Sequence, residues 1–200
     1  MKRCIMWLVS LLLACSALAS ESRDAVSATK SLLTRLLPKH AKQFEFKIIP
    51  ADQGRDVFEI ESRDGKAIIR GNNGVAMAMG LNWFLKHHCH CHVSWYGDQL
   101  TLPQPLPCVE PKVRRVSWAK HRYFLNYCCF GYSLPWWDWK QWERLIDWMA
   151  LNGVNMPLAV TGQEAVWLAV CRRLDLSDAQ SAEFLAGPPY LLFLWMGWSS

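Results

Sequence analysis

The feature that most constrains the fold is an alternation of strand and helix patterns after residue 121. Residues 122–128 are predicted to form a buried strand, and a second strand is predicted over 154–160. The helix between them has one apolar face, made by Trp139, Trp142, Leu145, Ile146 and Met149. Strand, helix, strand, helix is the order of a parallel sheet. Because two parallel strands cannot cover both faces of a sheet, we expect a truncated chain that begins a larger α/β structure.

Helix boundaries in this half are predicted from capping residues and breakers. Ser133 is expected to cap the first helix with Pro135 in its first turn, and Asn152-Gly153 is expected to end it. Thr161-Gly162-Gln163-Glu164 has the form of a capping box, for a helix that reaches about Leu174. Ser177-Asp178-Ala179-Gln180 starts another helix. Pro157 is unusual inside a strand because it has no N–H to donate.

The first half of the chain predicts a small α/β domain. Val26, Leu32, Leu33, Leu36 and Leu37 follow helical spacing, and Pro38 ends that helix. Residues 44–49 alternate between apolar and polar, as a half-buried strand does. Two further strands flank Asp64-Gly65, which predicts a hairpin. Gly71-Asn72-Asn73-Gly74 then opens a helix that carries Ala76, Ala78, Leu81 and Phe84.

A proline-rich segment divides the two halves. Residues 102–107 read Leu-Pro-Gln-Pro-Leu-Pro, which is typical of a linker, and we place the boundary just after it. The predicted domains are therefore 20–108, the N-terminal α/β domain, and 109–200. With 200 residues, the chain is too short for a complete (β/α)8 barrel, which needs roughly 250.

The first 19 residues predict an export signal. Lys2 and Arg3 precede an apolar run over 5–15, and Ala17-Leu18-Ala19 has the small-x-small pattern of a signal-peptidase site. The run is too short to span a bilayer of about 30 Å. An alternative is a bacterial lipobox, since Leu12-Leu13-Ala14 precedes Cys15, which would then carry lipid. We expect an exported protein, periplasmic, extracellular or held at the outer surface as a lipoprotein, with membrane contact only if Cys15 is lipidated.

Export permits disulfides, so six cysteines could pair, with a connectivity that the sequence leaves open: Cys89, Cys91, Cys108, Cys128, Cys129 and Cys171. The densest stretch reads His87-His88-Cys89-His90-Cys91-His92 and invites a metal hypothesis. Structural zinc sites, however, usually draw ligands from two separated pairs, and no second cluster occurs elsewhere in the sequence. We therefore favour thiols and imidazoles at the end of a helix, where His suits the dipole, and expect no metal and no cofactor.

Charge argues against nucleic-acid binding, and the chemistry of one turn argues against a P-loop. The net charge of +5 comes without a run of basic residues, which argues against a nucleic-acid partner. The glycine-rich turn over 71–74 could cradle an anion at a helix start. It lacks the lysine and the spacing of a P-loop, so we interpret it as a backbone turn.

Candidate functional residues follow the two predicted strands of the second half, since reactive groups of parallel βα units lie at the carboxyl ends of strands. They are Asn126, Tyr127, Cys128, Tyr132, Thr161, Gln163 and Glu164. Aromatic side chains suit the apolar faces of sugar rings. For Trp139, Trp142 and Trp148 we favour packing, whereas Trp136 and Trp137 stay open between packing and sugar contact. Glu164 most simply caps its helix, and no convincing pair of glycosidase carboxylates occurs at the strand ends.

Three long motifs carry a family resemblance: Arg122-Tyr-Phe-Leu-Asn-Tyr-Cys-Cys-Phe-Gly-Tyr-Ser133, then Trp136-Trp-Asp-Trp-Lys-Gln-Trp-Glu-Arg-Leu-Ile-Asp-Trp-Met-Ala-Leu-Asn-Gly153, and Thr161-Gly-Gln-Glu-Ala-Val-Trp167. They strongly resemble the alpha-N-acetylglucosaminidase family, glycoside hydrolase family 89. The resemblance extends upstream through residues 74–81 and 89–95 and downstream to Gly187-Pro188. It departs after Met196-Gly197, which suggests a frameshift, a gene-prediction break or a deliberate cut.

The resemblance implies a fold class and a function. The class is α/β: a small N-terminal α/β domain followed by the first βα units of a truncated (β/α)8 barrel. The implied enzyme is exported, removes terminal alpha-linked N-acetylglucosamine from glycans with retention, and uses two glutamates that lie beyond residue 200 and no metal, so this chain alone should be inactive. Asn126 and Cys128 would line the sugar pocket, and Phe193 stands where some relatives carry a pocket Trp. The alternative is a non-catalytic, aromatic-rich carbohydrate-binding or surface module.

Overall fold

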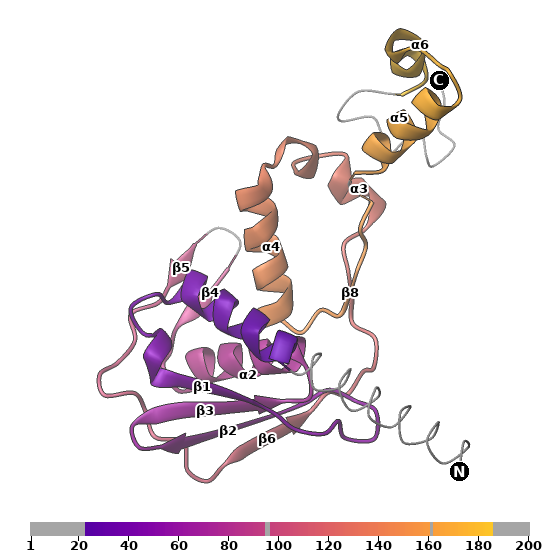
Figure 1. The fold of residues 1–200 in the computed structure, drawn as a ribbon. Helices are drawn as coiled ribbons and strands as arrows, with labels where there is room; N and C mark the ends of the chain where they lie inside the picture. The colour runs from indigo at the N-terminus through magenta and orange to yellow at the C-terminus, as the bar shows by residue number, and fades with distance from the viewer. Residues whose placement is uncertain (1–22, 95–96, 161, 186–200) are drawn as a thin grey trace, which may run out of the picture. The chain divides into compact units, whose positions relative to one another are not determined.

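A computed structural model describes residues 23–94, 97–160 and 162–185, and these form two compact units (Figure 1). The N-terminal unit consists of Met1–Arg122 and Leu145–Asn155, and the C-terminal unit consists of Tyr123–Arg144 and Met156–Ser200. The predicted export signal with Cys15, and Phe193, which was predicted to line the sugar pocket, lie outside the described residues. The predicted boundary at 108/109 stays a prediction.

The N-terminal unit is built on a four-stranded sheet with the order β1-β3-β2-β6. β1 pairs parallel with β3, whereas β2 is antiparallel to both β3 and β6. A helix over residues 23–36 and a second helix, α2, accompany the sheet (Figure 1). The unit also contains a short 3-10 helix, η1, and a pair of two-residue antiparallel strands, β4 and β5. The bounds are η1 Ala41–Gln43, β1 Phe44–Ile48, β2 Val57–Arg63, β3 Lys66–Gly71, α2 Gly74–His87, β4 His92–Val93, β5 Asp98–Gln99 and β6 Val113–Val116.

Most predicted elements of this unit are confirmed. The helix over 23–36 and the strand β1 lie where the apolar patterns put them. Asp64 and Gly65 both have positive φ, 51° and 72°, which is the geometry that a two-residue hairpin needs and that Gly adopts without strain. Asn73 caps α2, because its side-chain oxygen accepts the Ala76 N–H at 2.8 Å.

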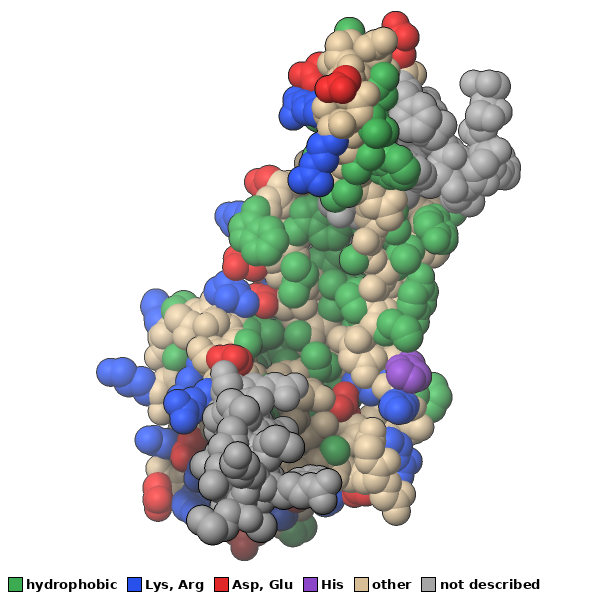
Figure 2. Space-filling model, turned by 45° about the vertical axis from the view of Figure 1, so that its right-hand side comes forward, with side chains coloured by type: hydrophobic (Ala, Val, Ile, Leu, Met, Phe, Trp, Pro, Cys, Tyr) green, Lys and Arg blue, Asp and Glu red, His purple; other side chains and the backbone are tan. Residues whose placement is uncertain are grey.

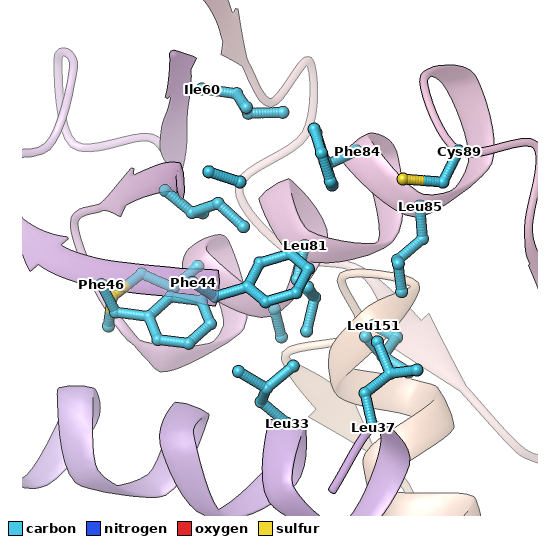
Figure 3. Packing of buried hydrophobic residues seen from close by; sticks show 14 of the residues in the cluster. Leu33, Leu37, Phe44, Phe46, Ile60, Leu81, Phe84, Leu85, Cys89 and Leu151 are labelled. Atoms are coloured by element: carbon cyan, nitrogen blue, oxygen red, sulfur yellow. The ribbon is translucent and has the colours of Figure 1, made fainter. Parts of the chain in front are cut away.

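The core of the N-terminal unit lies between the sheet and its helices (Figure 3). Ile60, Leu81 and Leu85 are fully buried, and the rings of Phe44 and Phe84 meet edge to face at 5.8 Å. Leu151 belongs to the same cluster, although it comes from the far end of a helix that we predicted as part of the second half. The second half of that helix, from residue 145, is therefore part of this unit.

Strand β6 is the one strand of the sheet that the sequence did not predict. It pairs with β2 from Val57↔Val116 to Ile60↔Val113, and it lies after the proline-rich segment. Between its two valines stand two arginines, so its apolar pattern is weak. Arg114 and Lys112 instead pair with the buried Glu59 at 2.6 and 3.0 Å. Burial would raise the pKa of Glu59, but the hydrogen bonds from Lys112 and Arg114 more than offset it and hold that pKa below its usual value.

The C-terminal unit contains two parallel βα steps. β7 pairs parallel with β8 through Tyr123↔Met156 and Phe124↔Pro157, which confirms the predicted parallel arrangement. Ser177 and Gln180 form a complete capping box at α6, also as predicted. No closed barrel is present in the described part of the chain. The bounds are β7 Tyr123–Phe124, α3 Tyr127–Phe130, η2 Leu134–Trp136, α4 Trp139–Leu151, β8 Met156–Pro157, α5 Gln163–Arg173 and α6 Asp178–Phe184.

Three predictions about this unit were wrong: the lengths of two strands and the residue that caps the following helix. The strands predicted over 122–128 and 154–160 are two residues each. Ser133 makes no side-chain cap, and a 3-10 turn follows it. The helix α4 starts instead at Trp139, because Asp138 accepts the Gln141 N–H at 3.0 Å and Gln141 accepts the Asp138 N–H at 2.9 Å. The predicted stop is confirmed, since α4 ends at Leu151 and Gly153 has φ 77°.

None of the helices that the structure describes is both long and apolar enough to cross a bilayer.

Candidate functional site

The candidate site lies at the carboxyl ends of β7 and β8, within the C-terminal unit. Because these strands are parallel, their carboxyl ends meet at one edge, and the segments that follow them lead into α3 and α5. The Leu158 N–H donates to the Phe124 carbonyl at 3.0 Å and extends the pairing past Pro157. The predicted residues after both strands follow from this edge.

Leu125 gives the turn out of β7 its direction. It is buried and has φ 74°, a conformation that bulky side chains rarely adopt and that costs of order 1–3 kcal/mol. The strand therefore ends at Phe124, and the next residue starts a new direction. The sequence does not indicate this role of Leu125, because a leucine carries no signal for a left-handed backbone.

Asn126 is the N-cap of α3, and its side-chain oxygen accepts the Cys129 N–H at 3.1 Å. The cap uses the oxygen and leaves the amide Nδ2 as a donor. Cys128 is exposed in the first turn of α3. The predicted strand over 122–128 is therefore wrong from residue 125 on, because the positive φ of Leu125 and the Asn126 cap turn the chain into a helical turn.

Aromatic side chains support and surround this turn. Phe130 of α3 stacks on Trp142 of α4 at 6.1 Å, and Trp137 meets Trp142 edge to face at 5.6 Å. Packing is therefore confirmed for Trp142 and is also the role of Trp137. Three aromatic residues are about two-thirds exposed: Tyr132, Trp136 and Trp139. Figure 2 shows many hydrophobic side chains, coloured green, at the surface of the face in view. Trp139 was predicted to pack, and that was wrong.

The second strand contributes the start of α5. Gly162 stands at its N-cap with φ 91° and makes no side-chain cap, while Thr161 of the predicted capping box lies outside the described residues. Gln163 is exposed and Glu164 lies in the first turn, where a carboxylate suits the helix dipole. Across the described ranges no group of three or more His, Cys, Asp or Glu could hold a metal ion.

The His/Cys tract is part of the N-terminal core. Cys89 and Cys91 are buried, and the Cys91 thiol donates to the Cys89 and Thr101 carbonyls, both at 3.6 Å. Burial, with a smaller effect of Cys91, raises the pKa of Cys89 to about 12. Both thiols are therefore neutral at ordinary pH. The six described cysteines are all free.

The His87 ring lies tilted against Trp83 at 4.2 Å and the His88 ring stacks on Phe84 at 5.6 Å, so these imidazoles pack along the end of α2.

The glycine-rich turn over 71–74 binds a carboxylate of the chain itself, that of Asp56. The Asp56 carboxylate accepts hydrogen bonds from the side-chain amides of Asn72 and Asn73 at 3.0 and 2.7 Å. Its other oxygen accepts from the guanidinium of Arg122. From the sequence, Arg122 was predicted as the first residue of a strand, and no local pattern links it to an aspartate 66 positions earlier.

Taken together, the small α/β unit, the parallel βα steps and the aromatic-rich segments at the strand ends define the class: an α/β protein with the first βα units of a (β/α)8 barrel. Two family models match the chain. The alpha-N-acetylglucosaminidase (NAGLU) N-terminal domain matches residues 27–108, and the tim-barrel domain of the same family matches 122–200. The chain belongs to the alpha-N-acetylglucosaminidase family, glycoside hydrolase family 89.

Individual relatives agree. The chain is 42% identical to human alpha-N-acetylglucosaminidase over 186 residues, which is 90% of this chain and 25% of the human protein. It also matches a family 89 glycoside hydrolase from Clostridium perfringens in complex with PUGNAc, with a TM-score of 0.84 and 36% identity over 89% of this chain and 20% of that one. A double Glu→Gln variant from the same organism, in complex with its substrate GlcNAc-alpha-1,4-galactose, matches with a TM-score of 0.83. The chain thus spans about a quarter or less of the length of these relatives.

Proposed function

We propose that this chain is the N-terminal part of an exported, retaining alpha-N-acetylglucosaminidase that removes terminal alpha-linked N-acetylglucosamine from glycans. The observation that carries the proposal is the match of two consecutive domain models of one family, in the family's own order, over 27–108 and 122–200. The bacterial relative bound to GlcNAc-alpha-1,4-galactose supports the substrate class.

The chemistry of retention requires two carboxyl groups about 5 Å apart, one as nucleophile and one as acid and base. We assign those glutamates to residues beyond 200, so the 200-residue chain contributes to binding and has no turnover of its own. Export with cleavage after Ala19, or lipidation at Cys15, remains part of the proposal.

Within this chain, Asn126 is the residue to which we assign a sugar contact. Its oxygen is engaged by the Cys129 N–H, so the group available to a sugar hydroxyl is the Nδ2 donor. Cys128, exposed in the same turn, lies two residues further on and leaves space for a sugar ring because its side chain is small. Phe193 is assigned to the same pocket on family resemblance alone.

The capping role makes a sharp experiment possible. In a protein that carries this chain together with the rest of the barrel, Asn126→Asp keeps an oxygen for the cap but removes the amide donor, whereas Asn126→Ala removes both. We expect both variants to lower kcat/KM on an aryl alpha-N-acetylglucosaminide by roughly 10- to 100-fold, since one polar contact is worth about 1.4 kcal/mol or more. Only Asn126→Ala should also lose stability, by about 1 kcal/mol.

The matched control is Asn152→Ala, which removes an exposed amide that bonds the Trp148 carbonyl in the N-terminal unit. Its kinetics should equal those of the unmodified protein. If Asn126→Asp keeps full kcat/KM, the assignment of Asn126 to the pocket is wrong.

The activity itself is tested by two measurements. The longer protein should cleave the alpha-linked but not the beta-linked aryl glycoside, and NMR of the first-formed sugar should show the alpha anomer. The 200-residue chain should show no turnover above a buffer blank. Sugar binding by the 200-residue chain, with no activity of any longer protein, would favour the carbohydrate-binding module instead.

A further inference from the structure

The guanidinium of Arg122 is the centre of a hydrogen-bonded network in the N-terminal unit. Its side chain is 13% exposed. Nη1 donates to the Ser117 hydroxyl at 3.2 Å and to the Ala119 carbonyl at 2.8 Å. Nε donates to the Gly153 carbonyl, and Nη2 donates to Asp56. Only the planar fork of an arginine reaches several acceptors in such different directions at once.

The charge of Arg122 is balanced by a carboxylate that is itself fixed. Burial would raise the pKa of Asp56, but hydrogen bonds from Asn72, Arg122 and Asn73 more than offset this and keep the pKa below its usual value. The Asp56 backbone carbonyl also accepts the Ser117 N–H at 2.7 Å. Asp56 therefore stays ionised, and it holds the guanidinium in a single orientation.

A second set of bonds joins Arg122 to Asn155 through the backbone. The Arg122 N–H donates to the Asn155 side-chain oxygen at 2.9 Å, and the Asn155 N–H donates back to the Arg122 carbonyl at 3.3 Å. The Asn155 amide also donates to the Lys120 carbonyl at 2.9 Å. Arg122 immediately precedes β7, and Asn155 immediately precedes β8.

These bonds matter because the strands they precede are so short. β7 and β8 share only two residue pairs, too few to define a register by themselves. A slip of one residue would turn every side chain of a strand to the opposite face. Asn126 lies four residues after Arg122, so an error at the start of β7 would reach it directly.

We infer that Arg122 and Asn155 are positioning residues for the sugar pocket: together they set the register of β7 against β8 and so place Asn126 relative to the segment after β8. Asp56 acts one step further away, by orienting Arg122. The inference rests on the proposed function for its kinetic consequence, but the register itself is measured independently.

The kinetic test uses the longer protein and a mild variant. Asn155 is exposed, so Asn155→Ala removes its side-chain bonds to Arg122 and Lys120 without emptying a core position, while the backbone bond from residue 155 to the Arg122 carbonyl is kept. Asn152→Ala is the control, three residues away and also exposed. We expect Asn155→Ala to lower kcat/KM at least about tenfold at 25 °C, where the protein is folded, because a small misplacement of a binding group has a large kinetic effect. Asn152→Ala should leave it unchanged.

A second pair of variants tests the arginine. Arg122→Lys keeps the charge but loses the fork, and it should lower kcat/KM in the same way. Its control is Arg172→Lys, since Arg172 forms an exposed two-bond pair with Asp178 far from either strand start. If Asn155→Ala and Arg122→Lys lower only the thermal midpoint and leave KM and kcat intact, the residues are merely structural and the inference is refuted.

Amide hydrogen exchange separates this inference from the proposed function. The Leu158 N–H, which donates to Phe124, reports directly on the pairing of β7 with β8. Exchange at Leu158 should be at least about tenfold faster in Asn155→Ala than in Asn152→Ala. If no longer protein turns over substrate, the proposed function fails, but the exchange rate at Leu158 still shows whether Asn155 sets the register. Equal exchange rates in the two variants would overturn the inference.

Discussion

The N-terminal core predicts a large cost for truncating Leu151, the last residue of α4. Leu151 is 1% exposed and belongs to the same buried cluster as Leu33 and Leu85. Replacing a fully buried leucine with alanine typically costs about 3 to 5 kcal/mol, because the removed methyl groups leave a cavity. Since domains are stable by only about 5–15 kcal/mol, Leu151→Ala should remove a large part of the unfolding free energy. Urea titration followed by circular dichroism measures the loss as a lower midpoint at an unchanged slope.

Ile146→Ala is the control on the same helix. Ile146 is 46% exposed, so its truncation should cost less than about 1 kcal/mol. Equal costs for the two variants would mean that the second half of α4 does not belong to the N-terminal core. The same reasoning predicts that a piece ending at residue 108, which lacks β6 and Leu151, is less stable than one that extends to 155.

Three further results are expected. Thiol modification at pH 8, located by peptide mass spectrometry, should be rapid at the exposed Cys108 and Cys128 and absent at Cys89 until the protein unfolds, and rapid modification of Cys89 in the native chain would contradict its burial. The depressed pKa of Asp56 gives stability that is present above its unfolded pKa of about 3.9 and lost as the pH falls through the lower folded value. The stability gap between the unmodified chain and Asp56→Asn should therefore shrink below about pH 4, and a constant gap in urea titrations would argue against the ion pair. Gly153→Ala should cost more than about 1 kcal/mol by the same titration, because φ is 77° and a Cβ would meet Met79.

Local pattern predicted the N-terminal elements well, because each depended on neighbours in sequence. The Asp64-Gly65 hairpin and the Asn73 cap are decided within a few residues, and both are confirmed. β6 was missed because its place in the sheet depends on ion pairs with Glu59, more than 50 positions away. An alternating apolar pattern carries no information about such a pair.

The sequence predicted where the candidate residues lie in the fold, but not the backbone conformation that carries them. The rule that parallel strands present reactive groups at their carboxyl ends led to Asn126 and Cys128, and the structure places both directly after β7. Their predicted extended arrangement failed, because the backbone of Leu125 adopts a left-handed conformation that its side chain does not favour. A buried residue held in this way indicates that surrounding structure over-determines the turn, which agrees with a network that fixes the start of β7.

Helix α4 shows most clearly what periodicity can and cannot tell. Its apolar spacing predicted one buried face. Trp142, Leu145 and Met149 are indeed buried or half-buried, whereas Trp139 and Ile146, predicted on the same face, are exposed. Periodicity does not say what covers that face. Trp142 stacks in the C-terminal unit, whereas Asp147, on the later part of the helix, accepts two hydrogen bonds from Arg35 at 2.6 and 2.8 Å in the N-terminal unit. The two parts of α4 belong to two units, so no single boundary along the sequence separates the units. A cut at residue 108 or 122 would follow the limits of the family models. It would also remove Leu145–Asn155, which the N-terminal core requires.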